Sequence, residues 1–162
     1  ELFHQLMYSH NFGHNGPEKY HGLGINAKMS ELQAAMGLTV LPHMDSILTK
    51  RRLICTYYDE HLNDLNLKKM KLRENTNWNY SYYPILFETE EILLRVKAKL
   101  NSGDIWPRRY FYPSLDTLPY LKQEFYCPKS RYVSETIMCL PLYESLELLD
   151  VEKIVKIINS VS

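Results

Sequence analysis

The chain has 162 residues, 45% of them hydrophobic, and its 19 Lys and Arg balance 19 Asp and Glu, so the formal net charge is zero. A neutral chain is a poor match for the phosphate backbone of nucleic acid or for anionic lipid, and no apolar run approaches the roughly 20 residues that span a bilayer. We therefore expect a cytoplasmic globular protein that binds neither nucleic acid nor membrane.

Residues 10–28 mix Gly, Asn, His and Pro without a helical or alternating period, which predicts a long irregular loop. Loops of this length are usually functional or disordered. Four large apolar residues within this loop favour one that packs against other parts of the protein.

A helix is expected to begin near Met29, because Ser30 and Gln33 form the S-x-x-Q pattern of a capping box. Apolar residues then recur at helical spacing. Pro42 lacks an amide hydrogen and clashes with the preceding turn, so it predicts a break, followed by a second helix over 42–62.

From about residue 63 onward, segments with strand-like alternation and segments with helical spacing follow one another. The sequence thus predicts an α+β domain, a small antiparallel sheet with helices on one face. Trp78 and Trp106 are expected to anchor its core. Strands are predicted over 66–72, 77–88, 104–113 and 138–143, and helices over 90–100, 118–122, 129–136 and 150–158.

Three histidines, His10, His14 and His21, lie close together in the loop, and imidazole is a common ligand for zinc or copper. No Cys or paired carboxylate completes a ligand set. Histidines that form hydrogen bonds within the loop, or contact a polar ligand, are therefore the favoured interpretation, and we expect no metal site.

Residues 22–26, GLGIN, come shortly before a helix N-terminus, where backbone N–H groups and the helix dipole favour a phosphate or carboxylate. Asn26 could cap the helix or reach outward. Because Gly-x-Gly also serves any tight turn, the pattern alone leaves both interpretations open.

The run WPRRYFYP places Arg108 and Arg109 beside Tyr110, Phe111 and Tyr112. Arginine suits a bidentate grip on phosphate, and aromatic rings can stack on a base or sugar, so the run fits a nucleotide-bearing ligand. A strand with its tyrosines on one face and its arginines merely exposed fits equally well.

These segments resemble a known family. Residues 12–41, FGHNGPEKYHGLGINAKMSELQAAMGLTVL, resemble the segment that follows the cofactor lysine in the DegT/DnrJ/EryC1/StrS family of pyridoxal-phosphate sugar aminotransferases. Residues 108–121 are similar to the family's Arg-x-Tyr-Tyr-Pro region, and residues 138–158 to its closing strand and helix. The resemblance covers nearly the whole chain. It is closest to the branch that aminates keto-6-deoxy sugars linked to dTDP.

The resemblance implies a C-terminal portion of a fold-type I aminotransferase. Residues 1–28 would be an active-site loop at the end of the large domain, which binds pyridoxal phosphate. Residues 29–62 would be connecting helices, and residues 63–162 the C-terminal small domain. The family works as a homodimer with active sites at the subunit interface, and its substrates are glutamate and a nucleotide sugar.

The resemblance also implies roles for loop residues. In the family, the Asn of a Gly-x-Asn-x-Arg-Met motif reaches the cofactor phosphate of the partner subunit. Asn26 occupies that position, Gly24 precedes it, and Lys28 replaces the Arg, which keeps the charge but loses the fork geometry. Gly24, Asn26 and Lys28 are thus expected to bind the cofactor.

The substrate site is expected in two places. The resemblance assigns His14 in the loop, and Arg108, Arg109, Tyr110 and Tyr112 in the small domain, to binding of the sugar nucleotide. The His of the family's Pro-Leu-His motif is here Asp116, which weakens the case for a substrate role at that position.

The reaction that the resemblance implies has two halves, in which glutamate gives its amine to the cofactor and the cofactor then passes it to the keto sugar. No lysine here lies in the context of the family's cofactor lysine, so the chain by itself is expected to be inactive and to hold no cofactor. The alternative is a non-enzymatic module for sugar-nucleotide binding or dimerisation. A metal-binding module through the three histidines is the least favoured hypothesis.

Overall fold

The structure is a computed structural model that describes residues 1–62, 66–121 and 126–161. The chain divides into two compact units, Glu1–Met44 and Asp45–Ser162. The expected boundaries after residues 28 and 62 concern the architecture of the whole enzyme and stay a prediction. In the part of the chain that the structure describes, no helix combines the length and apolarity needed to cross a membrane.

The first unit contains two helices joined by an irregular loop. Helix α1 (Leu2–Ser9), which the sequence pattern did not indicate, precedes the expected loop, and α2 spans Glu31–Val40. The capping box is confirmed, because the Gln33 amide donates to Ser30 Oγ at 3.3 Å while the Ser30 amide donates to Gln33 Oε1 at 2.9 Å. The reciprocal bonds fix where α2 begins.

The break at Pro42 is also confirmed. A 3₁₀ turn over Leu41–His43 (η1) separates α2 from α3, which spans Met44–His61. The second helix therefore starts two residues later than expected, since the proline is accommodated in the tighter turn instead of the first turn of the α-helix.

Large apolar side chains of the first unit are exposed. Helices α1 and α2 contain no buried residue. An apolar surface of this extent marks an interaction face. The exposed apolar residues of the two helices are Leu2, Phe3, Leu6, Met7, Leu32, Met36, Leu38 and Val40.

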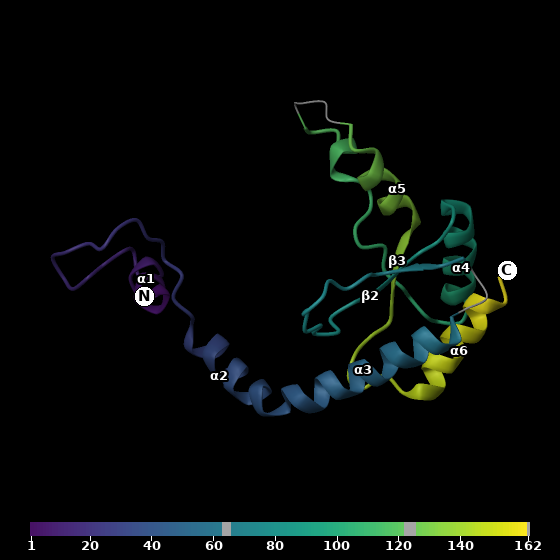
Figure 1. Ribbon diagram of the computed structural model, residues 1–162, viewed down its shortest axis with the longest axis horizontal. Coiled ribbons are helices and arrows are strands. Elements are labelled where there is room, and N and C mark those ends of the chain that lie inside the picture. The colour runs from purple at the N-terminus through teal and green to yellow at the C-terminus, as the bar shows by residue number, and fades with distance from the viewer. Residues whose placement is uncertain (63–65, 122–125, 162) are drawn as a thin grey trace. The chain divides into compact units, whose positions relative to one another are not determined.

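In the described residues, the second unit is built on a three-stranded antiparallel sheet in the order β1-β2-β3, with β1 over Lys68–Lys69, β2 over Tyr83–Leu86 and β3 over Ile137–Leu140. Strands β2 and β3 are labelled in Figure 1. Strands β2 and β3 pair along their whole length, with Tyr83 opposite Leu140. The expected strands over 66–72, 77–88 and 138–143 are thus confirmed in type but are shorter than predicted.

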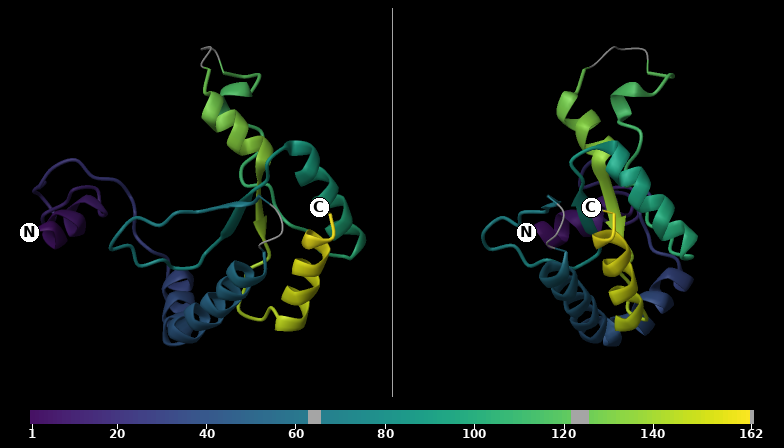
Figure 2. Two further views of the ribbon diagram at one scale, coloured as in Figure 1. Left: turned by 45° about the vertical axis from the view of Figure 1, so that its right-hand side comes forward. Right: turned by 90° about the vertical axis from the view of Figure 1, so that its right-hand side faces the viewer.

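Helices cover one face of this sheet. Helix α4 spans Glu90–Ser102 and α6 spans Leu148–Asn159, and the two lie beside each other in both views of Figure 2. Their apolar stripes and that of α3 join the inward side chains of β2 and β3 in one buried cluster. This confirms the expected α+β architecture. The largest fully buried side chains are Tyr58, Phe87, Ile54, Leu62, Ile85, Leu93, Leu100, Met138, Ile154, Ile158, Val96 and Val151.

The other predicted helices have mixed outcomes. Helices α4 and α6 confirm the expected ones, and α5, over Pro128–Thr136, begins one residue before its predicted start. In place of a helix over 118–122 there is a 3₁₀ turn at Leu115–Thr117 (η2), and the last residue of that predicted helix lies outside the described residues.

The predicted strand over 104–113 is wrong. This segment pairs with the sheet at a single bridge, Arg108 with Cys139. Pro107 and Pro113 have no N–H to continue a ladder on either side of that bridge. Trp106 is also not a core residue, because 67% of it is exposed, whereas Trp78 is partly buried and packs against the core.

We predict that Ile154→Ala lowers the free energy of unfolding of the second unit by about 2 to 5 kcal/mol, because it leaves a cavity in the shared core. Ile154 is 1% exposed. Urea denaturation followed by circular dichroism measures the change. Leu149→Ala in the same helix is the control, since Leu149 is 77% exposed and its loss should change stability by less than about 0.5 kcal/mol. Equal effects of the two substitutions would contradict this core assignment.

Candidate functional site

Two stretches of the loop in the first unit run side by side. The Ile25 amide donates to the Ser9 carbonyl at 2.8 Å, the Phe12 amide to the Ile25 carbonyl at 3.0 Å, and the Ala27 amide to the His10 carbonyl at 2.9 Å. Asn26 faces Asn11 in an isolated bridge. These backbone bonds hold the segment that carries Asn26 against the end of α1.

Gly24 lies where the two stretches come closest. A Cβ on Gly24 would lie 2.1 Å from the Gly13 amide nitrogen, and a Cβ on Gly13 would lie 1.9 Å from the Gly22 carbonyl oxygen. Gly13 also has φ +78°, in the left-handed region. The role that the structure shows for Gly24 is therefore the close approach of two backbone segments, which the sequence pattern did not indicate.

Asn26 and Lys28 lie on the exposed part of this loop. Lys28 Nζ donates to Asn11 Oδ1 at 3.3 Å and lies 5.0 Å from the centroid of the Phe12 ring. An amide donor and an ammonium two residues apart are a donor set that suits a phosphate group. These side chains therefore fit the phosphate end of a cofactor such as pyridoxal phosphate.

The loop histidines have separate surroundings. His14 lies 4.6 Å from Tyr20, His21 lies 4.6 Å from Tyr8, ring centroid to ring centroid, and the His10 ring bonds to the Leu6 carbonyl. His14 Nδ1 is buried and lacks a hydrogen-bond partner among the described residues. In those residues, the structure gathers no group of three metal-ligating side chains.

In the second unit, Arg109 is directed into the protein. Its Nη2 donates to Glu90 Oε1 at 2.7 Å, to the Glu135 carbonyl at 2.9 Å and to the Ser134 carbonyl at 3.3 Å. The Tyr112 ring covers the guanidinium, with 3.7 Å from Cζ to the ring centroid. The side chain of Arg109 is 12% exposed. Arg109 and Tyr112 thus fasten their segment to α4 and α5.

Arg108 has different surroundings from its neighbour. It is exposed, its Nη1 donates to the Tyr110 hydroxyl, and both residues line an open pocket of about 430 Å³. Among the described residues, Arg108 has no carboxylate partner. The pocket is lined by Ser81, Tyr82, Trp106, Pro107, Arg108, Tyr110, Cys139, Leu140, Pro141, Leu142 and Tyr143.

A second pocket, of about 270 Å³, adjoins the first. The two share Ser81, Tyr82, Tyr110 and Cys139. Burial raises the pKa of the Cys139 thiol, so this residue is a protonated part of the wall at neutral pH. The remaining lining residues are Met70, Trp78, Pro84, Phe111 and Ile137.

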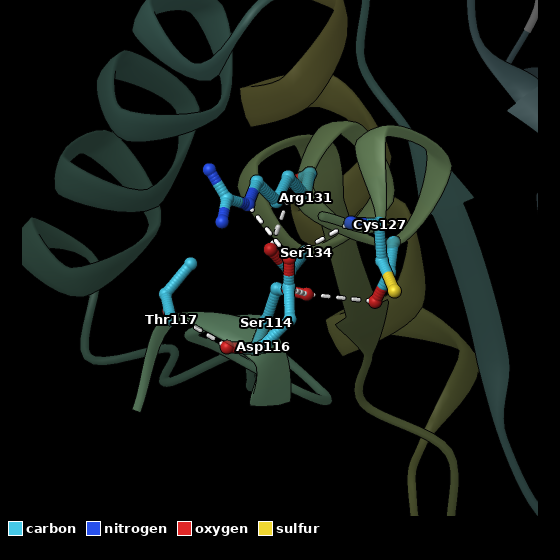
Figure 3. A network of polar contacts seen from close by, with 7 residues as sticks. Ser114, Asp116, Thr117, Cys127, Arg131 and Ser134 are labelled. Atoms are coloured by element: carbon cyan, nitrogen blue, oxygen red, sulfur yellow. Dashed lines mark hydrogen bonds and ion pairs between the residues drawn. The ribbon is translucent and has the colours of Figure 1, made fainter. Parts of the chain in front are cut away.

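Asp116 is a partly buried structural carboxylate. Its Oδ2 accepts from the Cys127 amide at 2.9 Å and from Arg131 Nε at 2.8 Å, and its Oδ1 accepts from the Ser114 hydroxyl (Figure 3). These contacts lower the pKa of Asp116 to about 2, and the hydrogen bond from Ser114 has the largest effect. Its carboxylate oxygens thus bond within the protein, and Asp116 fastens η2 to the start of α5.

Solved aminotransferases share this fold. A DegT DnrJ EryC1 StrS aminotransferase from Brucella abortus matches 98% of this chain with a TM-score of 0.80 at 24% identity, and the chain covers 43% of it. DesI, solved in the presence of its TDP-sugar product, matches 97% of the chain with a TM-score of 0.77 at 26% identity, and the chain covers 42% of it. The fold is therefore that of part of an aminotransferase.

The sequence defines the family more closely. Residues 1–159 match the DegT/DnrJ/EryC1/StrS aminotransferase family, and the chain belongs to that family, as the resemblance had indicated. The family's enzymes depend on pyridoxal phosphate. The dTDP-4-amino-4,6-dideoxy-D-glucose transaminase of Escherichia coli is 34% identical over 143 residues, which are 83% of this chain and 38% of that enzyme. The chain thus spans about two fifths of this relative's length.

We predict that Gly24→Ala opens the loop, because the added methyl group overlaps backbone atoms that cannot move aside. Hydrogen exchange of the Ile25 and Phe12 amides, measured by NMR, should become faster. Gly22→Ala is the matched control, since a Cβ there meets no atom within 4 Å. Unchanged hydrogen exchange in Gly24→Ala would contradict the close approach of the two backbone segments at Gly13 and Gly24.

The lowered pKa of Asp116 predicts a pH dependence. Because the folded-state pKa of about 2 lies below the ordinary aspartate pKa of 3.8, ionised Asp116 stabilises the fold fully above about pH 4, and this contribution is lost as the pH falls towards 2. Asp116→Asn should reduce the stability at pH 7 and flatten its decline between pH 4 and 2, measured by urea denaturation. Glu144→Gln, at an exposed carboxylate, should leave the decline as it is. A decline of the same steepness in Asp116→Asn would show that other groups cause it.

Proposed function

We propose that this chain is the C-terminal part of a pyridoxal-phosphate-dependent aminotransferase that moves an amino group from glutamate to a dTDP-linked keto-6-deoxy sugar. The observation that carries the proposal is the 34% identity, over 83% of the chain, to the Escherichia coli transaminase that is named for a dTDP-linked 4-amino-4,6-dideoxy sugar. The arginine-bearing aromatic pocket of the second unit supports a nucleotide sugar as substrate.

In the proposed enzyme, the loop of the first unit contributes to the cofactor site. Asn26 donates its amide N–H to the phosphate and Lys28 supplies positive charge, while Gly24 lets the loop keep its shape. Pyridoxal phosphate, when bound, carries the amine from glutamate, which leaves as 2-oxoglutarate, to the keto carbon of the sugar. The lysine that binds the cofactor belongs to another part of the enzyme, so the chain alone is inactive.

In our proposal, Arg108 and Tyr110 contact the sugar nucleotide, and His14 of the loop contacts the sugar nucleotide bound by the partner subunit. Arg109 and Tyr112 act as positioning residues, because their contacts with Glu90, with two backbone carbonyls and with each other hold the segment in place. A guanidinium is well suited to the diphosphate, since it offers several N–H donors in a fixed plane.

The exposed apolar face of the first unit supports the proposed architecture. Residues 1–28 belong to the large domain, 29–62 to connecting helices and 63–162 to the small domain. Apolar side chains of α1 and α2 that are exposed in this chain then pack against the rest of the enzyme and against a second copy in a cytoplasmic homodimer.

One observation favours a second candidate, a module that binds sugar nucleotides without catalysis. Both pockets lie wholly within the second unit, so binding there does not need the first. Incubation of the complete enzyme with glutamate and a dTDP-linked keto-6-deoxy sugar, with the product identified by mass spectrometry, separates the two functions. Amination supports the enzyme, whereas binding of dTDP without amination supports the module.

We predict that Asn26→Ala weakens binding of pyridoxal phosphate to the complete enzyme by about 10-fold to 100-fold, the range expected for loss of one hydrogen bond to a charged group. Equilibrium dialysis followed by absorbance of the cofactor measures the affinity. Asn15→Ala, on the same loop and also exposed, should bind the cofactor as the unsubstituted enzyme does. If the two substitutions have the same effect, the assignment of Asn26 is wrong.

A further inference from the structure

The two adjoining pockets of about 430 and 270 Å³ in the second unit form one continuous lining with two kinds of chemistry. Their common border consists of Tyr82 and Tyr110, whose rings meet edge to face with centroids 5.5 Å apart, together with Ser81 and Cys139. A ligand that is charged at one end and flat and apolar at the other could contact both pockets at once.

The smaller pocket has an aromatic, uncharged lining. Tyr82, Tyr110 and Phe111 form a chain of ring contacts, in which Tyr110 and Phe111 have centroids 5.0 Å apart. Trp78 and Met70 contribute further apolar surface, and none of the described residues that line this pocket carries a charge. Aromatic walls of this kind bind the faces of nucleobases by stacking.

The larger pocket has a single positive charge among its described lining residues, that of Arg108. Tyr110 accepts a hydrogen bond from this guanidinium and also lines the smaller pocket, so it stands between the charged and the aromatic part. The position of Arg108 beside the aromatic walls matches the order of groups in a nucleoside diphosphate, in which the diphosphate follows the nucleoside.

We propose that the smaller pocket binds the nucleobase of the sugar nucleotide, stacked against Tyr82 and Phe111, while Arg108 binds its diphosphate. This inference rests on the proposed function, because it assigns the nucleotide end of that substrate. It adds Tyr82 and Phe111 to the substrate residues expected from the sequence. Phe111 is 76% exposed, so part of its ring is open to contact with a base.

The test measures binding of dTDP and of inorganic pyrophosphate to the complete enzyme by isothermal titration calorimetry. Phe111→Ala should weaken dTDP binding by about 10-fold to 100-fold, the range for loss of one aromatic stacking partner, and leave pyrophosphate binding unchanged. Arg108→Gln should weaken both. The control is Tyr120→Ala, since Tyr120 is 74% exposed, as Phe111 is, but lines neither pocket.

Each outcome decides the proposal. Selective loss of dTDP binding in Phe111→Ala supports it. If Phe111→Ala binds dTDP as the unsubstituted enzyme does, or changes the oligomeric state without weakening dTDP binding, the proposal is wrong. It is also wrong if the unsubstituted enzyme does not bind dTDP. The proposed function is tested separately in the same samples by adding glutamate and measuring the conversion of the bound cofactor from the cofactor's absorbance. That half of the reaction involves no nucleotide.

Discussion

The position of the segment that lines the pockets of the second unit depends on one nearly buried cation, Arg109. Arg109 joins the segment between Pro107 and Pro113 to a carboxylate of α4, Glu90, and to carbonyl groups at the end of α5. That carboxylate lies in the first turn of α4, where the helix dipole also favours a negative charge. A segment that forms a single bridge with the sheet thus gains a fixed position, and Arg108 is held at the pocket by its neighbour.

The helices of the second unit were predictable because their signals are local. Helices α4 and α6 have 13 and 12 residues with an apolar stripe. Earlier in the chain, the capping box marks the start of α2 and Pro42 marks the break between α2 and α3. The predicted strands were too long. Aromatic alternation continues through residues 77–88, well beyond the four residues of β2 that pair. The alternation in residues 104–113 is compatible with a pocket lining as well as with a strand. The strand predicted there was therefore wrong.

The candidate site was less predictable, because it depends on contacts between residues far apart in the chain. Arg108 and Arg109 are the same residue type in adjacent positions, and only the location of Glu90 and of the α5 carbonyls separates a pocket residue from an internal anchor. Tyr82 and Phe111 carried an available signal, the aromatic runs themselves, but which rings line a pocket is decided by how β2 and the 104–113 segment come together.

The backbone contact between Gly13 and Gly24 limits which residues this loop can accept. The two backbones touch at positions where neither residue has room for a side chain, so a larger residue at either position disrupts the same contact. At Gly22, which lies between them, a Cβ would meet no atom within 4 Å. A side chain can therefore be added at position 22 while the backbone contacts that hold the segment with Asn26 stay the same.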